Sequence, residues 1–276
     1  MKALRFLLLS LCLHVIAVSG QNRIHADTDL QLSSRYGIGM DRLYEQGASP
    51  LHYSGPSLQW AGESSFAWRR YCILQDFGLS ASMGFNPKST ATAIGLTIES
   101  GTRFLYLWHK GMDMRFRLWG GGGLDEYFHF TYLPELMNAS YSLTDFLSLS
   151  VCFTVEYDFS LRKGKAYKPF TAFGSLNLPF AGIALRPGFS YMENYNDNLN
   201  TLEFLMDTYT LQGIAFSGVS VSTGIACTLK NHNRIGLSYD WTYRSSGNSG
   251  VYRFDHARHL LALSFSMNLL HLNRCA

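Results

Sequence analysis

The stretch LSLSVCFTVEYDF, residues 147–159, decides the fold class because it alternates apolar and polar side chains without a break. Successive side chains of a β-strand point to opposite faces, so the stretch predicts one strand with an apolar face and a polar face. It is longer than the roughly five or six residues of an ordinary globular strand, and it covers the ~9–11 residues that a tilted strand needs to cross a bilayer. The pattern therefore predicts a membrane-spanning β-strand.

The same alternation recurs along the chain, which extends the prediction from one strand to a whole barrel. The recurrences fall at residues 77–85, 94–99, 112–118, 183–191, 219–229, 235–244 and 261–269. At ~18 residues for each strand with its connection, residues 57–276 predict an all-β fold, a closed antiparallel transmembrane β-barrel of about 12 strands, with about 10–14 also compatible. A closed ladder suits a bilayer because it leaves no unpaired strand edge in lipid.

The chain before residue 57 lacks this alternation. Lys2 and Arg5, followed by the apolar run 6–18 and small residues, predict a secretory signal peptide at residues 1–20. Residues 21–56 are mixed and turn-rich, and we expect them to form a periplasmic arm or a plug. Export and the barrel pattern together predict the bacterial cell outer membrane as the location, with outer-membrane lipid and the barrel-assembly machinery as partners.

Composition and charge narrow the function classes. The 23 Lys and Arg residues and 20 Asp and Glu residues give a net charge of +3 at pH 7, and loss of Lys2 and Arg5 with the signal peptide leaves about +1. This balance gives no reason to expect a nucleic-acid partner. Charged residues make up 16% of the chain, below the ~25% of ordinary soluble domains, and aromatic residues make up 14%. We expect the aromatic clusters at 104–108, 127–128 and 241–243 to form girdles at the lipid headgroups.

The polar faces of the predicted strands carry charges that we expect to line the lumen. These residues are Glu99, Arg115, Arg117, Glu156, Asp158, Arg186, Asp240 and Arg244. A strongly selective pore usually carries a ring of one sign, whereas here four arginines face four carboxylates. This balance of charge favours ion pairs that hold the walls of the lumen together. A weakly selective passage and a lumen blocked by residues 21–56 stay open as alternatives.

One pair of residues has a spacing known from enzymes. His52 and Ser54 share the His-x-Ser spacing of some outer-membrane lipases, but they precede the turn at Gly55-Pro56 and have no third partner that the sequence identifies. We therefore predict no catalytic residues and no enzymatic activity.

Metal and cofactor motifs are not recognised either. The separations of Cys72, Cys152, Cys227 and Cys275 match no metal or redox spacing. His256 and His259 are three residues apart next to a predicted strand, where that spacing places them on opposite faces. We expect no metal and no cofactor, and the sequence does not identify a ligand.

The start of the chain resembles a known group of proteins. Gly37-Ile38-Gly39, Asp41-Arg42-Leu43-Tyr44 and the segment 49–56 resemble the opening of an uncharacterised outer-membrane β-barrel family of Bacteroides-type bacteria. The resemblance implies an outer-membrane location and a barrel fold, and it implies no known activity.

Three functions remain open at this point. Small side chains on the polar faces, among them Ser148 and Ser150, favour a narrow pore for small polar solutes. The balanced lumen charges favour a non-conducting structural or surface-binding barrel. Only His52 and Ser54 support an outer-membrane lipid-modifying enzyme.

Overall fold

The computed structural model describes residues 28–46, 48–110, 115–135, 141–163, 166–187, 209–246 and 253–269. The signal peptide predicted at residues 1–20 lies outside these ranges. Within them, no helix is long and apolar enough to cross a membrane.

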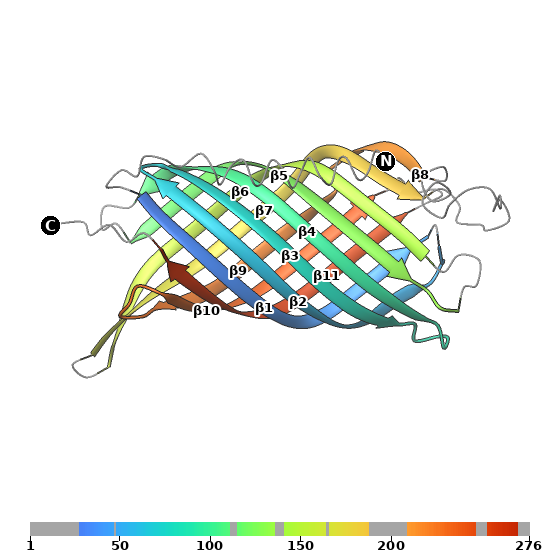
Figure 1. Ribbon diagram of the computed structural model, residues 1–276, viewed down its shortest axis with the longest axis horizontal. Coiled ribbons are helices and arrows are strands. Elements are labelled where there is room, and N and C mark those ends of the chain that lie inside the picture. Colours follow the sequence, from blue (N-terminus) through green and yellow to red (C-terminus); the bar gives the residue numbers. More distant parts are fainter. Residues whose placement is uncertain are drawn as a thin grey trace.

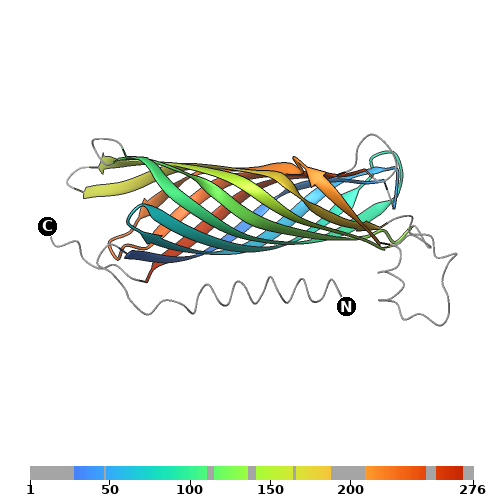
Figure 2. The ribbon, with the colours of Figure 1, turned by 90° about the horizontal axis from the view of Figure 1, so that it is seen from above.

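The regular structure of the described residues is a set of long β-strands (Figures 1 and 2). The strands are β1 (Thr28–Glu45), β2 (His52–Trp68), β3 (Tyr71–Phe85), β4 (Thr92–Lys110), β5 (Phe116–Tyr132), β6 (Tyr141–Lys163), β7 (Ala166–Pro187), β8 (Tyr209–Ala215), β9 (Gly218–Thr228), β10 (Arg234–Ser246) and β11 (Phe254–Asn268). They run obliquely to the long axis of the molecule (Figure 1), as closure of a sheet into a barrel requires.

Ten of these strands close into an antiparallel barrel, which confirms the predicted fold class. Each strand from β1 to β7 pairs with the next in sequence, and β9, β10 and β11 follow in the same way. The ring closes where β9 pairs with β7 and where β11 pairs with β1. In this register Ile38 lies opposite both Leu58 and Leu261, so outward apolar side chains from adjacent strands stand side by side.

The short strand β8 lies outside the ring of ten. It pairs with residues 181–187 of β7, whereas β9 pairs with residues 170–177 of the same strand. Both strands are antiparallel to β7, so they follow one another along it. β8 and β9 are separated at Phe216, whose φ of 52° lies in the left-handed region, where non-glycine residues are uncommon.

The barrel needs fewer strands than about 12 because its strands are long. β6 has 23 residues and β7 has 22, more than the ~18 assumed for a strand and its connection together. The same length of chain therefore closes with ten strands.

The prediction that residues 21–56 form an arm or a plug is wrong for the part of that segment that the structure describes. Residues 28–45 form β1 and pair with both β2 and β11. The lumen face of β1 carries Gly37 and Gly39, which hides the alternation in the sequence. A side chain at Gly39 would overlap the backbone of His259 on β11, so this close approach requires glycine.

Apolar side chains cover the outer surface of the ring. Ile38, Leu58, Leu237 and Leu261 are each more than half exposed, and each points away from the lumen. In water such a surface would be unfavourable, whereas in a bilayer it faces hydrocarbon.

The two ends of the barrel differ in the lengths of their connections. At one end, which we call the turn end, β1 starts, β11 finishes, and residues 69–70 and 229–233 join neighbouring strands. At the opposite end, the loop end, residues 46–51 join β1 to β2 and residues 188–208 separate β7 from β8. The contents of the lumen also differ between these two ends.

Candidate functional site: the barrel lumen

An apolar cluster, which we call the apolar plug, fills the lumen near the loop end. Its buried members are Leu43, Tyr53, Ala93, Tyr127, Leu133, Phe146, Ala184 and Phe254. The ring of Phe146 on β6 lies 5.8 Å from that of Tyr127 and 5.6 Å from that of Phe254, measured between centroids. β5 and β11, which carry Tyr127 and Phe254, are five places apart in the ring of ten. Aromatic side chains from opposite walls therefore meet in the middle of the lumen.

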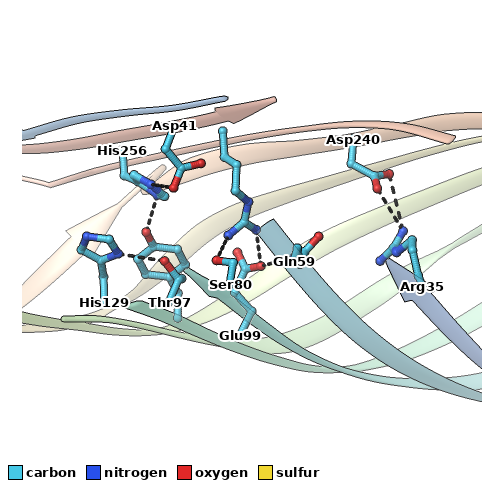
Figure 3. A network of polar contacts seen from close by, with 11 residues as sticks. Arg35, Asp41, Gln59, Ser80, Thr97, Glu99, His129, Asp240 and His256 are labelled. Atoms are coloured by element: carbon cyan, nitrogen blue, oxygen red, sulfur yellow. Dashed lines mark hydrogen bonds and ion pairs between the residues drawn. The ribbon is translucent and has the colours of Figure 1, made fainter. Parts of the chain in front are cut away.

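A hydrogen-bonded layer adjoins the plug (Figure 3). The Tyr127 hydroxyl lies 2.5 Å from His256 Nδ1, and His256 Nε2 lies 3.1 Å from a carboxylate oxygen of Asp41. Thr97 Oγ1 lies 2.9 Å from His129 Nδ1, and the two histidine rings are 4.8 Å apart between centroids. All of these residues are at most 5% exposed, so the layer is closed to solvent.

A buried ion pair also belongs to the loop half of the lumen. Arg186 Nη2 donates to Glu45 at 2.5 Å, and Arg186 Nη1 donates to Ser246 at 3.1 Å. The guanidinium carbon lies 5.5 Å from the ring centroid of Phe254, and both charged side chains are at most 2% exposed. Because either charge alone would be costly to bury, the pair ties β1 to β7 across the lumen.

A cavity of about 550 Å³ lies in the turn half of the lumen and reaches the turn end at Arg69. Ion pairs line its walls, with N–O distances of 3.4 Å, 3.0 Å and 2.7 Å. These pairs are Arg35–Asp240, Arg103–Asp76 and Arg117–Glu156. Their side chains are 13–28% exposed, so water in the cavity screens them. At the inner end of the cavity, Arg258 donates to both Ser80 and Glu99.

The structure brings most of the charged residues chosen from the sequence together in this lumen. The cavity lining includes Glu99, Arg117, Glu156, Asp240 and Arg244. Asp158 accepts from Arg117 Nη1 at 2.9 Å, and Arg186 lies deeper, in the loop half. Arg115 is not among the residues that the structure brings together here. β5 begins at Phe116, so Arg115 precedes the strand whose alternation was expected to orient it, and it is exposed.

Sequence reasoning missed several lumen residues. Arg35, Asp41 and Glu45 belong to β1, which was expected to be an arm or a plug. Arg103 and Arg258 lie outside the alternating segments predicted at 94–99 and 261–269. At the start of β11 the buried Phe254, His256 and Arg258 alternate with exposed or half-buried residues, but their mixed chemistry gives no apolar–polar alternation in the sequence.

The histidine, serine and cysteine motifs noted in the sequence do not assemble into a site among the described residues. His52 and Ser54 are both exposed on β2, outside the lumen, and no hydrogen bond joins their side chains among the described residues. His256 is buried in the lumen, whereas His259 is exposed on the outer face, as a strand requires. In the described ranges no group of histidine, cysteine and acidic residues has the arrangement of a metal site, and Cys72, Cys152 and Cys227 are free thiols.

Comparison with known proteins places the chain in a family. Residues 4–241 match the family model described as "Protein of unknown function (DUF3316)", and the chain belongs to this family. No curated protein matches the sequence.

Among solved structures, the outer membrane protease OmpT from Escherichia coli is similar, with a TM-score of 0.50, 9% identity, and coverage of 88% of this chain and 96% of that one. The transport unit of the autotransporter AIDA-I from Escherichia coli has a TM-score of 0.49, 7% identity, and coverage of 89% and 90%. At this identity the likeness to OmpT concerns the fold alone. The fold is therefore that of an outer-membrane β-barrel.

Proposed function

We propose that this protein is an integral β-barrel of the bacterial outer membrane whose resting lumen does not conduct. The observation that carries the proposal is the apolar plug, in which Tyr127 and Phe254 from opposite walls approach to 6.4 Å between ring centroids. Buried aromatic rings in contact leave no water-filled path for ions. The buried Arg186–Glu45 pair supports the same closure from β7 and β1.

Location and orientation follow from the outer surface and the connections. The outward apolar side chains and the closed ladder suit a bilayer, and the resemblance of residues 37–56 to Bacteroides-type barrels supports an outer membrane. Barrels of this class carry short periplasmic turns and longer extracellular loops. We therefore orient the turn end, with its cavity, toward the periplasm and the plugged loop end toward the outside.

The test combines location with permeability. Membrane fractionation should place the protein in the outer membrane, and unboiled protein should migrate faster in detergent gels than boiled protein. Liposomes that contain the folded protein should not swell in small sugars, in contrast to liposomes that contain a general porin. Steady swelling at matched protein density would contradict the non-conducting lumen, and recovery in the soluble periplasmic fraction would contradict the location.

A gated passage for small polar solutes is the second candidate. The observation that favours it is the charged cavity of about 550 Å³, which would form half of a path if the apolar plug moved aside. Transient current steps in the wild-type protein, with long silent intervals, would support this alternative over permanent closure.

The proposal includes no catalytic role. His52 and Ser54 stand apart from the lumen, and their exposed side chains have no described acidic partner. Purified protein should hydrolyse no phospholipid. Hydrolysis by the wild-type protein that Ser54→Ala abolishes would contradict this part of the proposal.

A further inference from the structure

One arginine at the inner end of the cavity lacks the partner that its neighbours have. Three arginines among the described residues are at most 5% exposed, Arg186, Arg244 and Arg258. Arg186 pairs with Glu45, and Arg258 pairs with Glu99.

Arg244 forms no ion pair and no hydrogen bond within the described part of the chain. Its Nε and Nη1 atoms are buried without a hydrogen-bond acceptor. Its guanidinium carbon lies 5.7 Å from the ring centroid of Tyr127, so one face of the group stacks on the apolar plug. A buried guanidinium that stays unpaired is unfavourable, because it has lost water without gaining an acceptor.

The cavity extends inward as far as this side chain. Arg244 lines the cavity on β10 after Ser238, Asp240 and Thr242, which lead toward it from the turn end. It is therefore the innermost residue of β10 in the cavity. The cavity volume of about 550 Å³ lies in the ~300–1,000 Å³ range of small-molecule sites.

The charged neighbours are engaged with other partners. The Glu99 carboxylate, which attracts Arg244 electrostatically, accepts through Oε2 from Arg258 and from Gln59. Asp125 accepts from Asn177 at 2.8 Å and lies 3.7 Å from Arg103. The Asp41 carboxylate accepts from His256.

We propose that the inner end of the lumen binds one small anion, a carboxylate or a phosphate group, which enters from the turn end and pairs with Arg244. A guanidinium matches either group with two parallel hydrogen bonds, a geometry that a lysine does not supply. Because the other wall arginines named here are already paired, a ligand with a single anionic group matches the one guanidinium without an ion pair. Thr242 and Ser238 supply polar surface beside the rest of the ligand.

This inference rests on the closed lumen of the proposed function, because the plug forms the back wall of the site. The two fail separately. Steady conductance by a protein that still binds an anion through Arg244 would contradict the closed lumen and would leave the proposed binding site supported.

Isothermal titration calorimetry on the full-length protein, folded in detergent, tests the site with inorganic phosphate and with acetate as probes, at constant ionic strength set with chloride. We expect saturable binding of at least one probe, which also tells phosphate recognition from carboxylate recognition. Arg244→Gln should weaken that binding at least about tenfold. Arg244→Lys should restore part of the binding affinity, because lysine returns the positive charge but not the two parallel donors of a guanidinium.

Arg70→Gln provides the matched control, because it removes an equal charge from an exposed side chain at the turn end that does not line the cavity. It should leave binding unchanged. Gel mobility before boiling confirms that each variant is folded. Equal affinity in the wild-type and Arg244→Gln proteins, or the absence of saturable binding with both probes, would overturn the proposal.

Discussion

The loop half and the turn half of the lumen are built by the same strands and yet differ in chemistry. Along β5 the inward side chains change from Arg117 near the turn end to Tyr127 near the loop end. Along β11 they change from Ser266 to Phe254 in the same direction. The alternation sets which side chains face inward, but the identity of the inward residues sets whether a given depth of the lumen is dry or wet.

This difference between the two halves changes how much an ion pair contributes to stability. The Arg186–Glu45 pair is at most 2% exposed, whereas the Arg117–Glu156 pair is 23% and 26% exposed. An ion pair in a dry environment is costly to break, because the remaining charge keeps no partner. An ion pair beside water loses little when one member is removed.

The largest expected effect comes from the buried pair. Glu45→Ala leaves Arg186 buried without its carboxylate and should lower the free energy of unfolding by about 3–5 kcal/mol. Arg117→Gln, in the turn half, should cost about 1 kcal/mol or less. Urea titrations of folding in lipid vesicles measure both values. Equal losses would mean that the two halves are equally hydrated.

The outer face offers a second contrast with the wet half of the lumen. Leu58→Lys places a charge against lipid and should cost about 2–4 kcal/mol near the bilayer midplane. Gln59→Lys, at the next position, points into the cavity beside Glu99 and should cost about 1 kcal/mol or less. The same vesicle titrations apply. A larger loss for Gln59→Lys than for Leu58→Lys would reverse the assignment of inner and outer faces.

A smaller effect distinguishes hydrogen bonds in the two halves. Tyr127→Phe removes the partner of His256 Nδ1 in the closed layer and should cost about 1–3 kcal/mol. Ser222→Ala removes a donor to Asp240, which keeps Arg35 and Ser238, and should cost about 1 kcal/mol or less. Thermal unfolding of both variants in the same detergent compares them. A greater loss of stability for Ser222→Ala would contradict the assignment of the loop half as dry and the turn half as hydrated.

The sequence predicted the wall of the barrel better than its contents, for a physical reason. Which face a side chain takes depends on its immediate neighbours in the strand, so residues 147–159 were enough to identify a membrane strand. The contents of the lumen depend on which strands meet. Asp41 and His256 come together only because β1 pairs with β11, and Glu45 meets Arg186 only because the ring closes.

Glycine explains the largest error of prediction. β1 was missed because Gly37 and Gly39 interrupt the polar face that the other strands display. Gly39 is required by the close approach of β11, which becomes visible only once the two strands are paired. The expected number of about 12 strands was slightly too high because the strands are longer than the ~18 residues assumed for a strand with its connection.

The most direct test of the closed lumen is single-channel recording in planar bilayers. The wild-type protein should be silent, and the double variant Phe146→Ala with Phe254→Ala should pass ions, because its plug has lost two of its aromatic rings. Phe265→Ala, which removes an aromatic ring from the outer face, is the matched control and should remain silent. Steady conductance by the wild-type protein, or silence of a folded double variant, would contradict the account.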